Sequence, residues 1–472
     1  MDASNDSEPG SDLVTPLGDL RPSEKKALAE FRTKLEEAII TNRLFSKPAH
    51  RHHRHDKSKT RVANACSPDF CMLEPSPDKD EDLKNISLWG IPLLPSKGHE
   101  DTDAVLLKFL QAREFRVSEA FHMLRRTLRW RRGFGADDIL LEDLELPELN
   151  SAAYMDGTDK YGHPICYNVY GVFRDKELYD KAFGNEERRE RFVQWRIRLM
   201  EEGIKQLSFK QGGVGSMLQI IDLKNSLSHS MKELRSTTKK VVTILQDNYP
   251  EFAERTIFLN VSFRSYAYHA LFSHFVSPRS RSKFIFARPS KVTETLLKFI
   301  APEDLPVQYG GFKREEDEEF SAENGRVSEI IVRGSSAGTI EIPIIEPFYS
   351  FDMLIHITNE ASYDQSISLS TNGVPTQQPG VTVVWDISVV GWEVSYKEEF
   401  VPDDEGSYNV LIRKEKKLDE SSRNSFYISE PGKVVLTIEN RTFKKKRVLY
   451  RSKSKPTIPL YNLLNQTNRP AV

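Results

Sequence analysis

The chain has 472 residues, which at about 150 residues per domain predicts two or three domains. Its 67 lysines and arginines against 69 aspartates and glutamates give a formal charge of −2, so we expect no nucleic-acid partner. The three cysteines are too few for a disulfide framework, and no apolar run reaches the roughly 18 residues of a membrane-spanning helix. We therefore expect a cytoplasmic protein that meets membranes peripherally.

Residues 1–85 are rich in Ser, Pro, Asp, Lys and His and predict a mostly disordered tail with one helix, over residues 23–40. A histidine-rich cluster at 50–55 could bind a metal or an anionic lipid. Because a flexible segment does not fix ligand geometry, a solvated tail is favoured and no metal site is expected.

Residues 86–145 predict a helical N-terminal lobe. One helix begins near Asp103 and a second near Ser118, each with an apolar stripe. Their other faces carry a run of arginines: Arg113, Arg116, Arg125, Arg126, Arg129, Arg131 and Arg132. Such a run is either a solvated face or a basic patch that meets phosphates.

Residues 146–313 alternate between strand and helix patterns. Strands are expected at 165–169, 217–223, 256–261 and 283–287, and helices at 193–207 and 234–245. This alternation is typical of an α/β domain with a mainly parallel sheet.

The composition changes again after residue 313. Residues 314–336 are acidic and then rich in Ser and Gly, which predicts a linker. Residues 337–452 predict an all-β sandwich, followed by a tail over 453–472. The expected strands are 339–345, 351–358, 366–369, 381–390, 392–400, 408–414 and 434–439.

No catalytic constellation is present in the sequence. Glycines 212, 213 and 215 precede a strand, whereas a nucleotide-binding loop follows one. Asp222 is the best lone carboxylate, and capping of the next turn is favoured over acid-base chemistry. We therefore expect no enzymatic activity and no cofactor.

An unusually apolar segment covers residues 263–275. Near one face it carries Phe263, Tyr266, Ala270, Leu271 and Phe275. Such a helix is either buried core or a lid that closes an apolar cavity.

Several motifs resemble those of the CRAL-TRIO lipid-transfer family. They are DAVLLKFLQAREF at 103–115, DKYGHP at 159–164, IIDLK at 220–224, NYPE at 248–251 and LPVQYGG at 305–311. VWDI at 384–387, GW at 391–392 and KKKR at 444–447 resemble a GOLD domain. A CRAL-TRIO domain followed by a GOLD domain is the patellin arrangement, and the resemblance covers about 88–455.

The resemblance implies a pocket that holds one phospholipid, phosphatidylinositol or a phosphoinositide, beneath a mobile gate helix. The gate falls on 263–275. The headgroup positions map onto Arg113, Glu251, Ser280 and Lys283, which offer charged donors, a hydroxyl and a carboxylate acceptor. Positions that carry hydroxyls in phosphatidylcholine-holding members are Met155, Cys166, Met217 and Gln219 here.

We therefore expect a non-enzymatic phosphoinositide-binding and transfer protein that acts in membrane trafficking, including cell-plate formation during cytokinesis. Membrane docking is assigned to the arginine-rich helices and to the basic tract Lys444, Lys445, Lys446, Arg447 and Arg451, continued by Lys453 and Lys455. One alternative is a lipid-filled scaffold that recruits proteins through the GOLD domain. A headgroup enzyme centred on Asp222 or Glu251 is the other.

Overall fold

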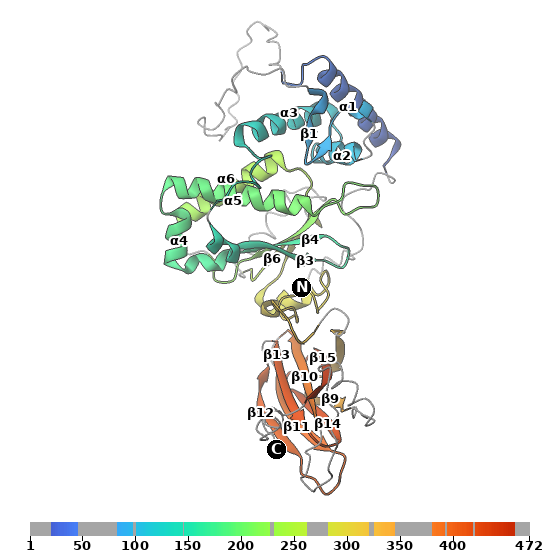
Figure 1. The fold of residues 1–472 in the computed structure, drawn as a ribbon. Helices are drawn as coiled ribbons and strands as arrows, with labels where there is room; N and C mark the ends of the chain where they lie inside the picture. The colour runs from blue at the N-terminus through green and yellow to red at the C-terminus, as the bar shows by residue number, and fades with distance from the viewer. Residues whose placement is uncertain are drawn as a thin grey trace, which may run out of the picture. The chain divides into compact units, whose positions relative to one another are not determined.

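The computed structural model describes residues 20–45, 83–97, 101–144, 146–226, 231–261, 282–320, 325–344, 380–391, 394–418 and 421–457 (Figure 1). The chain divides into two compact units, with the boundary in the sequence between Pro289 and Ser290. Each unit is described by itself below.

The first unit opens with a lobe of three helices, α1 (Pro22–Ile40), α2 (Thr102–Ala112) and α3 (Val117–Phe134). A short hairpin of β1 (Ser87–Leu88) and β2 (Ile91–Pro92) precedes α2. The helix expected over 23–40 is present as α1, but it is not part of a disordered tail.

Phe31 and Leu35 of α1 are fully buried, and Lys34 donates a hydrogen bond to Ser118 of α3 at 3.1 Å. The helix is therefore part of the folded lobe and not of a tail.

A five-stranded sheet with the order β3-β4-β5-β6-β7 forms the centre of the first unit. Its strands are β3 (Ala153–Thr158), β4 (Pro164–Val169), β5 (Met217–Asp222), β6 (Ala253–Leu259) and β7 (Phe284–Phe286). Strands β4 to β7 are parallel, as predicted, and β3 is an antiparallel edge strand that the sequence did not suggest.

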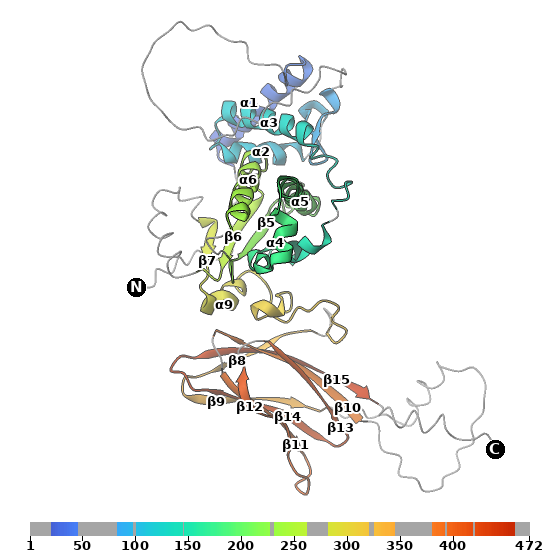
Figure 2. The same ribbon diagram turned by 90° about the vertical axis from the view of Figure 1, so that its left-hand side faces the viewer.

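Helices α4 (Lys176–Phe183), α5 (Glu186–Lys205) and α6 (Lys232–Asn248) connect the parallel strands, and Figure 2 shows α5 and α6 beside β5 and β6. Asn185 caps α5 by accepting a hydrogen bond from the Arg188 amide at 2.8 Å. A buried cluster ties these helices to the N-terminal lobe: Glu201 accepts hydrogen bonds from Arg131 and from the Tyr249 hydroxyl, both at 2.5 Å. The predicted helical lobe and α/β domain are thus confirmed.

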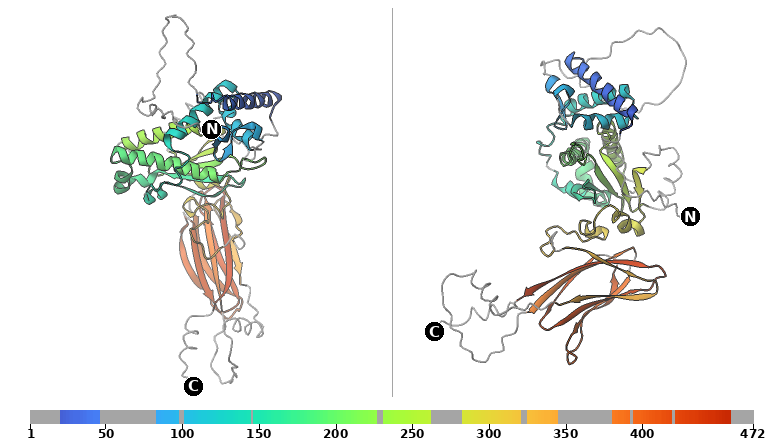
Figure 3. Two further views of the ribbon diagram at one scale, coloured as in Figure 1. Left: turned by 45° about the horizontal axis from the view of Figure 1, so that its top comes forward. Right: turned by 90° about the vertical axis from the view of Figure 1, so that its right-hand side faces the viewer.

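The second unit begins with the short helix α9 (Val292–Leu296) and continues into a β-sandwich. Its two antiparallel sheets have the orders β13-β10-β15-β8 and β12-β11-β14-β9, and Figure 3 shows them as two layers. The strands are β8 (Ser328–Val332), β9 (Ser336–Pro343), β10 (Gly380–Val390), β11 (Val394–Pro402), β12 (Val410–Leu418), β13 (Ser422–Ile428), β14 (Gly432–Asn440) and β15 (Lys446–Thr457). The predicted sandwich is confirmed, while the strands expected at 351–358 and 366–369 lie outside the described residues.

The sandwich extends beyond the limits that the sequence suggested. Strand β15 covers a segment read as a basic tract and tail, yet it pairs with β10 over eleven residues, from Gly380 opposite Thr457 to Val390 opposite Arg447. Residues before the sandwich also join the unit, because the Gly310 and Gly311 carbonyls accept hydrogen bonds from Ser388 at 2.8 Å and Ser421 at 2.7 Å.

Candidate functional site

Two of the four predicted headgroup residues meet at the end of the central sheet. Glu251 lies in the turn between α6 and β6, and Lys283 immediately precedes β7. The Lys283 Nζ lies 2.6 Å from the Glu251 Oε2, and both side chains are mostly shielded, at 14% and 16% exposure. Lys283 also donates to the Ala253 carbonyl at 3.3 Å. The chain therefore holds a partly desolvated cation and anion together at this point.

A third charged residue, Lys108 of α2, lies behind this pair. Its Nζ donates to the carbonyl of Glu251 at 2.9 Å and to that of Gly215 at 2.6 Å, and it sits 4.2 Å from the centre of the Phe252 ring. Burial lowers the pKa of Lys108 to about 7, and the nearby Glu251 charge opposes that shift. The sequence analysis did not select Lys108, although a single lysine within the apolar run 105–110 was a visible signal.

Arg113 lies at the C-terminus of α2, five residues beyond Lys108. Its guanidinium donates to the Ala112 carbonyl at 3.1 Å, and it forms no ion pair within the described chain. The structure therefore places Arg113 on the helix that touches Glu251 but shows no contact between Arg113 and the Glu251–Lys283 pair. The fourth headgroup residue, Ser280, lies outside the described residues, as do the five gate residues Phe263, Tyr266, Ala270, Leu271 and Phe275.

One face of the sheet near Lys283 carries apolar side chains that are not fully buried. Phe258 and Phe286 stack with their ring centres 4.9 Å apart, and Phe284 is 40% exposed. Because side chains alternate along a strand, the opposite face carries Ile257, which is fully buried. The strand register thus places a partly exposed apolar surface on β6 and on β7, the strand that Lys283 precedes.

The same face has few hydroxyl groups toward β4 and β5. Gln219 and Cys166 are register partners there, and Gln219 accepts a hydrogen bond from Asn168 at 3.2 Å. Asn168 in turn accepts one from Arg196 at 2.6 Å. An amide and a thiol therefore stand where phosphatidylcholine-holding relatives are expected to carry hydroxyls.

The lone carboxylate Asp222 has a structural role, as predicted. It accepts hydrogen bonds from the backbone amide of Lys224 and the side chain of Asn260, both at 2.7 Å. This arrangement caps the turn after β5.

The predicted docking tract does not form one exposed basic surface. Lys444 and Lys445 are exposed, whereas Lys446 is buried and Arg447 forms an ion pair with Glu329 at 2.6 Å. The prediction that Arg451 belongs to a docking surface is wrong, because its side chain is only 4% exposed. A buried arginine cannot serve as a docking cation.

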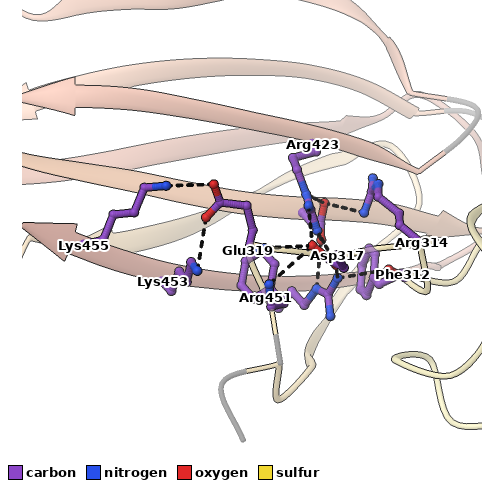
Figure 4. Close-up of polar contacts among 10 residues, drawn as sticks. Phe312, Arg314, Asp317, Glu319, Arg423, Arg451, Lys453 and Lys455 are labelled. Carbon is purple, nitrogen blue, oxygen red and sulfur yellow. Dashed lines mark hydrogen bonds and ion pairs between the residues drawn. The ribbon is translucent and has the colours of Figure 1, made fainter. Parts of the chain in front are cut away.

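Figure 4 shows the acidic residues that pair with the C-terminal part of this tract, from Arg451 to Lys455. Asp317 accepts hydrogen bonds from Arg451 at 2.9 Å and from Arg423 at 2.7 and 2.8 Å, and Glu319 forms ion pairs with Lys453 and Lys455. These acidic residues belong to the segment that was expected to be a linker. In the structure, 314–320 is instead packed against the sandwich.

The arginines of α3 are also engaged within the lobe. Arg131 is buried against Glu201, and Arg125 and Arg129 donate to the carbonyls of Leu44 and Phe45. These three arginines, from a run that could have been a solvated face or a basic patch, therefore hold α3 in place within the first unit.

Comparison with known proteins assigns the family. Residues 27–126 match the CRAL/TRIO N-terminal domain, 150–311 the CRAL/TRIO domain, and 365–446 the Patellin-1-like C-terminal GOLD domain. Over 447 residues the chain is 38% identical to Patellin-3 of Arabidopsis thaliana, covering 93% of this chain and 76% of that protein. The chain belongs to the patellin family.

Two further relatives extend this result. Patellin-4 of Arabidopsis thaliana is 50% identical over 80% of this chain, and the match spans 63% of that patellin's length. "Phosphatidylinositol transfer protein SFH5" of Meyerozyma guilliermondii is 32% identical over 34% of this chain and 51% of its own. The N-terminal match from residue 27 agrees with the packing of α1 in the lobe.

Neither a metal cluster nor a membrane span was found in the described part of the patellin chain. No group of three or more His, Cys, Asp or Glu side chains there could hold a metal ion, and the histidine-rich cluster at 50–55 lies outside it. No described helix has the length and apolarity needed to cross a bilayer.

Proposed function

We propose that this patellin is a non-enzymatic protein that binds phosphatidylinositol or a phosphoinositide and transfers it between membranes. It would act from the cytoplasm, peripherally, in membrane trafficking that includes cell-plate formation, with the sandwich available to protein partners. The observation that carries the proposal is the Lys283–Glu251 pair, which is shielded at 14% and 16% exposure.

The chemistry of the pair suits an inositol phosphate headgroup. Lys283 supplies a charged donor for a phosphate oxygen, and Glu251 supplies an acceptor for inositol hydroxyls. Arg113 would add a second cation, since no carboxylate within the described chain neutralises it. The name of the Meyerozyma relative, a phosphatidylinositol transfer protein, supports the same ligand class.

The acyl chains require an apolar enclosure. A diacyl lipid has on the order of 30 methylenes, and at about 0.8 kcal/mol each its transfer to water costs roughly 25 kcal/mol. The partly exposed face that includes Phe258 and Phe284 supplies apolar surface on β6 and on β7, the strand that follows Lys283. We propose that this surface contacts the tails and that the gate assigned to 263–275 covers them.

The two carboxylates that an enzyme reading would use have other partners. Asp222 caps a turn, and Glu251 is paired with Lys283. Neither forms the nucleophile-base arrangement that group-transfer chemistry requires.

The test is transfer of labelled phosphatidylinositol between vesicles by wild type and Lys283→Ala. Loss of one charged hydrogen bond should slow this transfer by roughly ten- to a hundredfold. Lys181→Ala is the matched control, because Lys181 also pairs with a carboxylate, Glu177 at 3.0 Å, but on an exposed helix surface. Equal rates for wild type and Lys283→Ala would remove Lys283 from the headgroup site, and a copurifying lipid that never exchanges with vesicles would favour the scaffold alternative.

A further inference from the structure

The loop between β14 and β15 presents an aromatic side chain directly to solvent. Phe443 is 97% exposed, and the next two residues, Lys444 and Lys445, are exposed as well. A bare phenyl ring in water loses the stabilisation that burial would give it. A single exposed ring is common on protein surfaces, so the surroundings of Phe443 must decide whether it meets a partner.

The loop is held in place by a buried asparagine. Asn440, only 1% exposed, donates to the carbonyls of Val332, Arg333 and Lys444 and accepts from the amide and the hydroxyl of Thr442. These five hydrogen bonds span 2.7 to 3.2 Å. They fix the backbone of the loop against the end of β8.

The neighbouring turn supports the same shape. The Ser335 amide donates to the Thr442 carbonyl at 2.8 Å, and Gly334 packs so closely that a Cβ there would lie 2.3 Å from the Phe443 carbonyl oxygen. Phe443 is therefore projected outward by a preorganised scaffold, which lowers the entropic cost of using it for binding.

The charges around Phe443 indicate what covers it. Exposed Arg333, Lys444 and Lys445 form no ion pair within the described chain. By contrast, the adjacent Arg441 pairs with both Glu415 and Glu439, each at 2.6 Å, which leaves that cluster with one net negative charge. The loop and the neighbouring turn between β8 and β9 thus offer one apolar ring and three cations without an ion pair in the described chain, and these outnumber the surplus carboxylate beside Arg441. This combination fits the phosphate plane and outer acyl region of an anionic bilayer.

A second exposed aromatic provides the contrast. Tyr408 is 90% exposed in the loop between β11 and β12, which lies at the opposite end of β14 because Pro402 pairs with Gly432 there. Its loop carries Asp403, Asp404 and Glu405, which an anionic surface would repel. Both aromatics are exposed, but acidic side chains surround Tyr408 whereas basic side chains flank Phe443.

We propose that the β14–β15 loop is a membrane anchor that inserts Phe443 into the interface of an anionic bilayer while Arg333, Lys444 and Lys445 contact lipid phosphates. Of the predicted docking tract, this anchor keeps only Lys444 and Lys445. It adds Phe443, an apolar residue that the predicted tract did not include. It rests on the proposed function only in that both require a peripheral membrane protein.

The experiment measures binding of the full chain to sedimented vesicles of phosphatidylcholine, with or without about 30 mol% phosphatidylserine. We expect Phe443→Ala to weaken binding to the anionic vesicles by roughly tenfold, and Lys444→Glu with Lys445→Glu by at least about thirtyfold. Tyr408→Ala is the matched control and should bind as wild type does. Raised salt should weaken wild-type binding.

A Phe443→Trp variant tests insertion directly. Its additional fluorescence, relative to wild type, should shift to the blue on anionic vesicles and be quenched by lipids brominated on the acyl chain. Unchanged vesicle binding by Phe443→Ala, or an added indole signal that is indifferent to brominated lipid, would overturn the anchor in favour of a protein groove.

Separate measurements test the lipid pocket and the membrane anchor. Native mass spectrometry should find the same bound lipid in Phe443→Ala as in wild type, whereas Lys283→Ala should hold less phosphatidylinositol but still sediment with vesicles. If Phe443→Ala lost its bound lipid, the effect would lie in the pocket and the anchor would be wrong.

Discussion

Arg451 and Asp317 form an ion pair at 2.9 Å although 134 residues separate them in the sequence. The same guanidinium lies 2.8 Å from Asp386, which is fully buried in β10. The pair therefore fastens the acidic segment after Phe312 onto the central strands of the sandwich. Asp317 had been expected to lie in a linker, and Arg451 had been assigned to a docking tract.

The first prediction concerns the stability of this contact. Asp317→Asn removes the charge that Arg423 and Arg451 share, and breaking such a shielded network should cost about 2–4 kcal/mol. Calorimetry of the full chain should show one transition lowered by about 5–10 °C. Glu315→Gln, in an exposed position of the same acidic run, is the control and should melt as wild type does.

The same variant has a defined pH dependence. Hydrogen bonding to Arg423 holds the pKa of Asp317 well below its ordinary value. A lowered folded-state pKa contributes stability that is present above the unfolded value of about 3.9 and is lost as the pH falls further. The gap between wild type and Asp317→Asn should therefore be full at neutral pH and shrink in acid. A gap that stayed constant down to about pH 2 would contradict this account.

The second prediction concerns Lys108. Its folded-state pKa of about 7 lies below the unfolded value of about 10.4, so the unfolded chain binds more protons between these limits. Stability should rise with pH across this window, by at most about 1.4 kcal/mol per unit, and Lys108→Met should lack that rise. Lys205→Met, on the exposed end of α5, should keep it. Parallel profiles for wild type and Lys108→Met, measured by denaturant unfolding, would show that Lys108 stays charged.

The third prediction separates folding from binding at the headgroup pair. The exchange variant Glu251→Lys with Lys283→Glu keeps an opposite-charge pair but loses the Lys283 hydrogen bond to the Ala253 carbonyl, so it should fold with a loss of about 1–3 kcal/mol of stability. The positions of donor and acceptor are reversed, however, so transfer of phosphatidylinositol should fall at least about tenfold. Recovery of wild-type transfer would mean that the pair serves only the fold.

The sequence pattern predicted those helices and strands whose buried faces show as a regular spacing of apolar residues. The run MLQIID gave β5, and the apolar spacing of 193–207 gave α5, because burial leaves a direct periodic signal in both. The part of strand β15 after Tyr450 was not predicted, because its residues alternate between basic and serine side chains before a proline and carry no apolar pattern. Their charges are balanced by Asp317 and Glu319, and such distant pairing leaves no trace in a local pattern.

The site shows the same division. Glu251 and Lys283 were found through the family resemblance, and the structure joins them. Lys108 was missed because a lysine among apolar residues is usually read as an interruption, whereas two backbone carbonyls satisfy it here. The packing of α1 was missed for a related reason, since its partners lie across the polar segment 46–82.

The place of β15 in its sheet bears on how the protein is made. The strand lies between β10 and β8, so neither neighbour can complete its hydrogen bonding until residues 446–457 have left the ribosome. Until then the nascent sandwich carries two open strand edges that can pair with other chains. A premature stop before Lys446 would therefore yield an aggregating product rather than a shortened but working patellin.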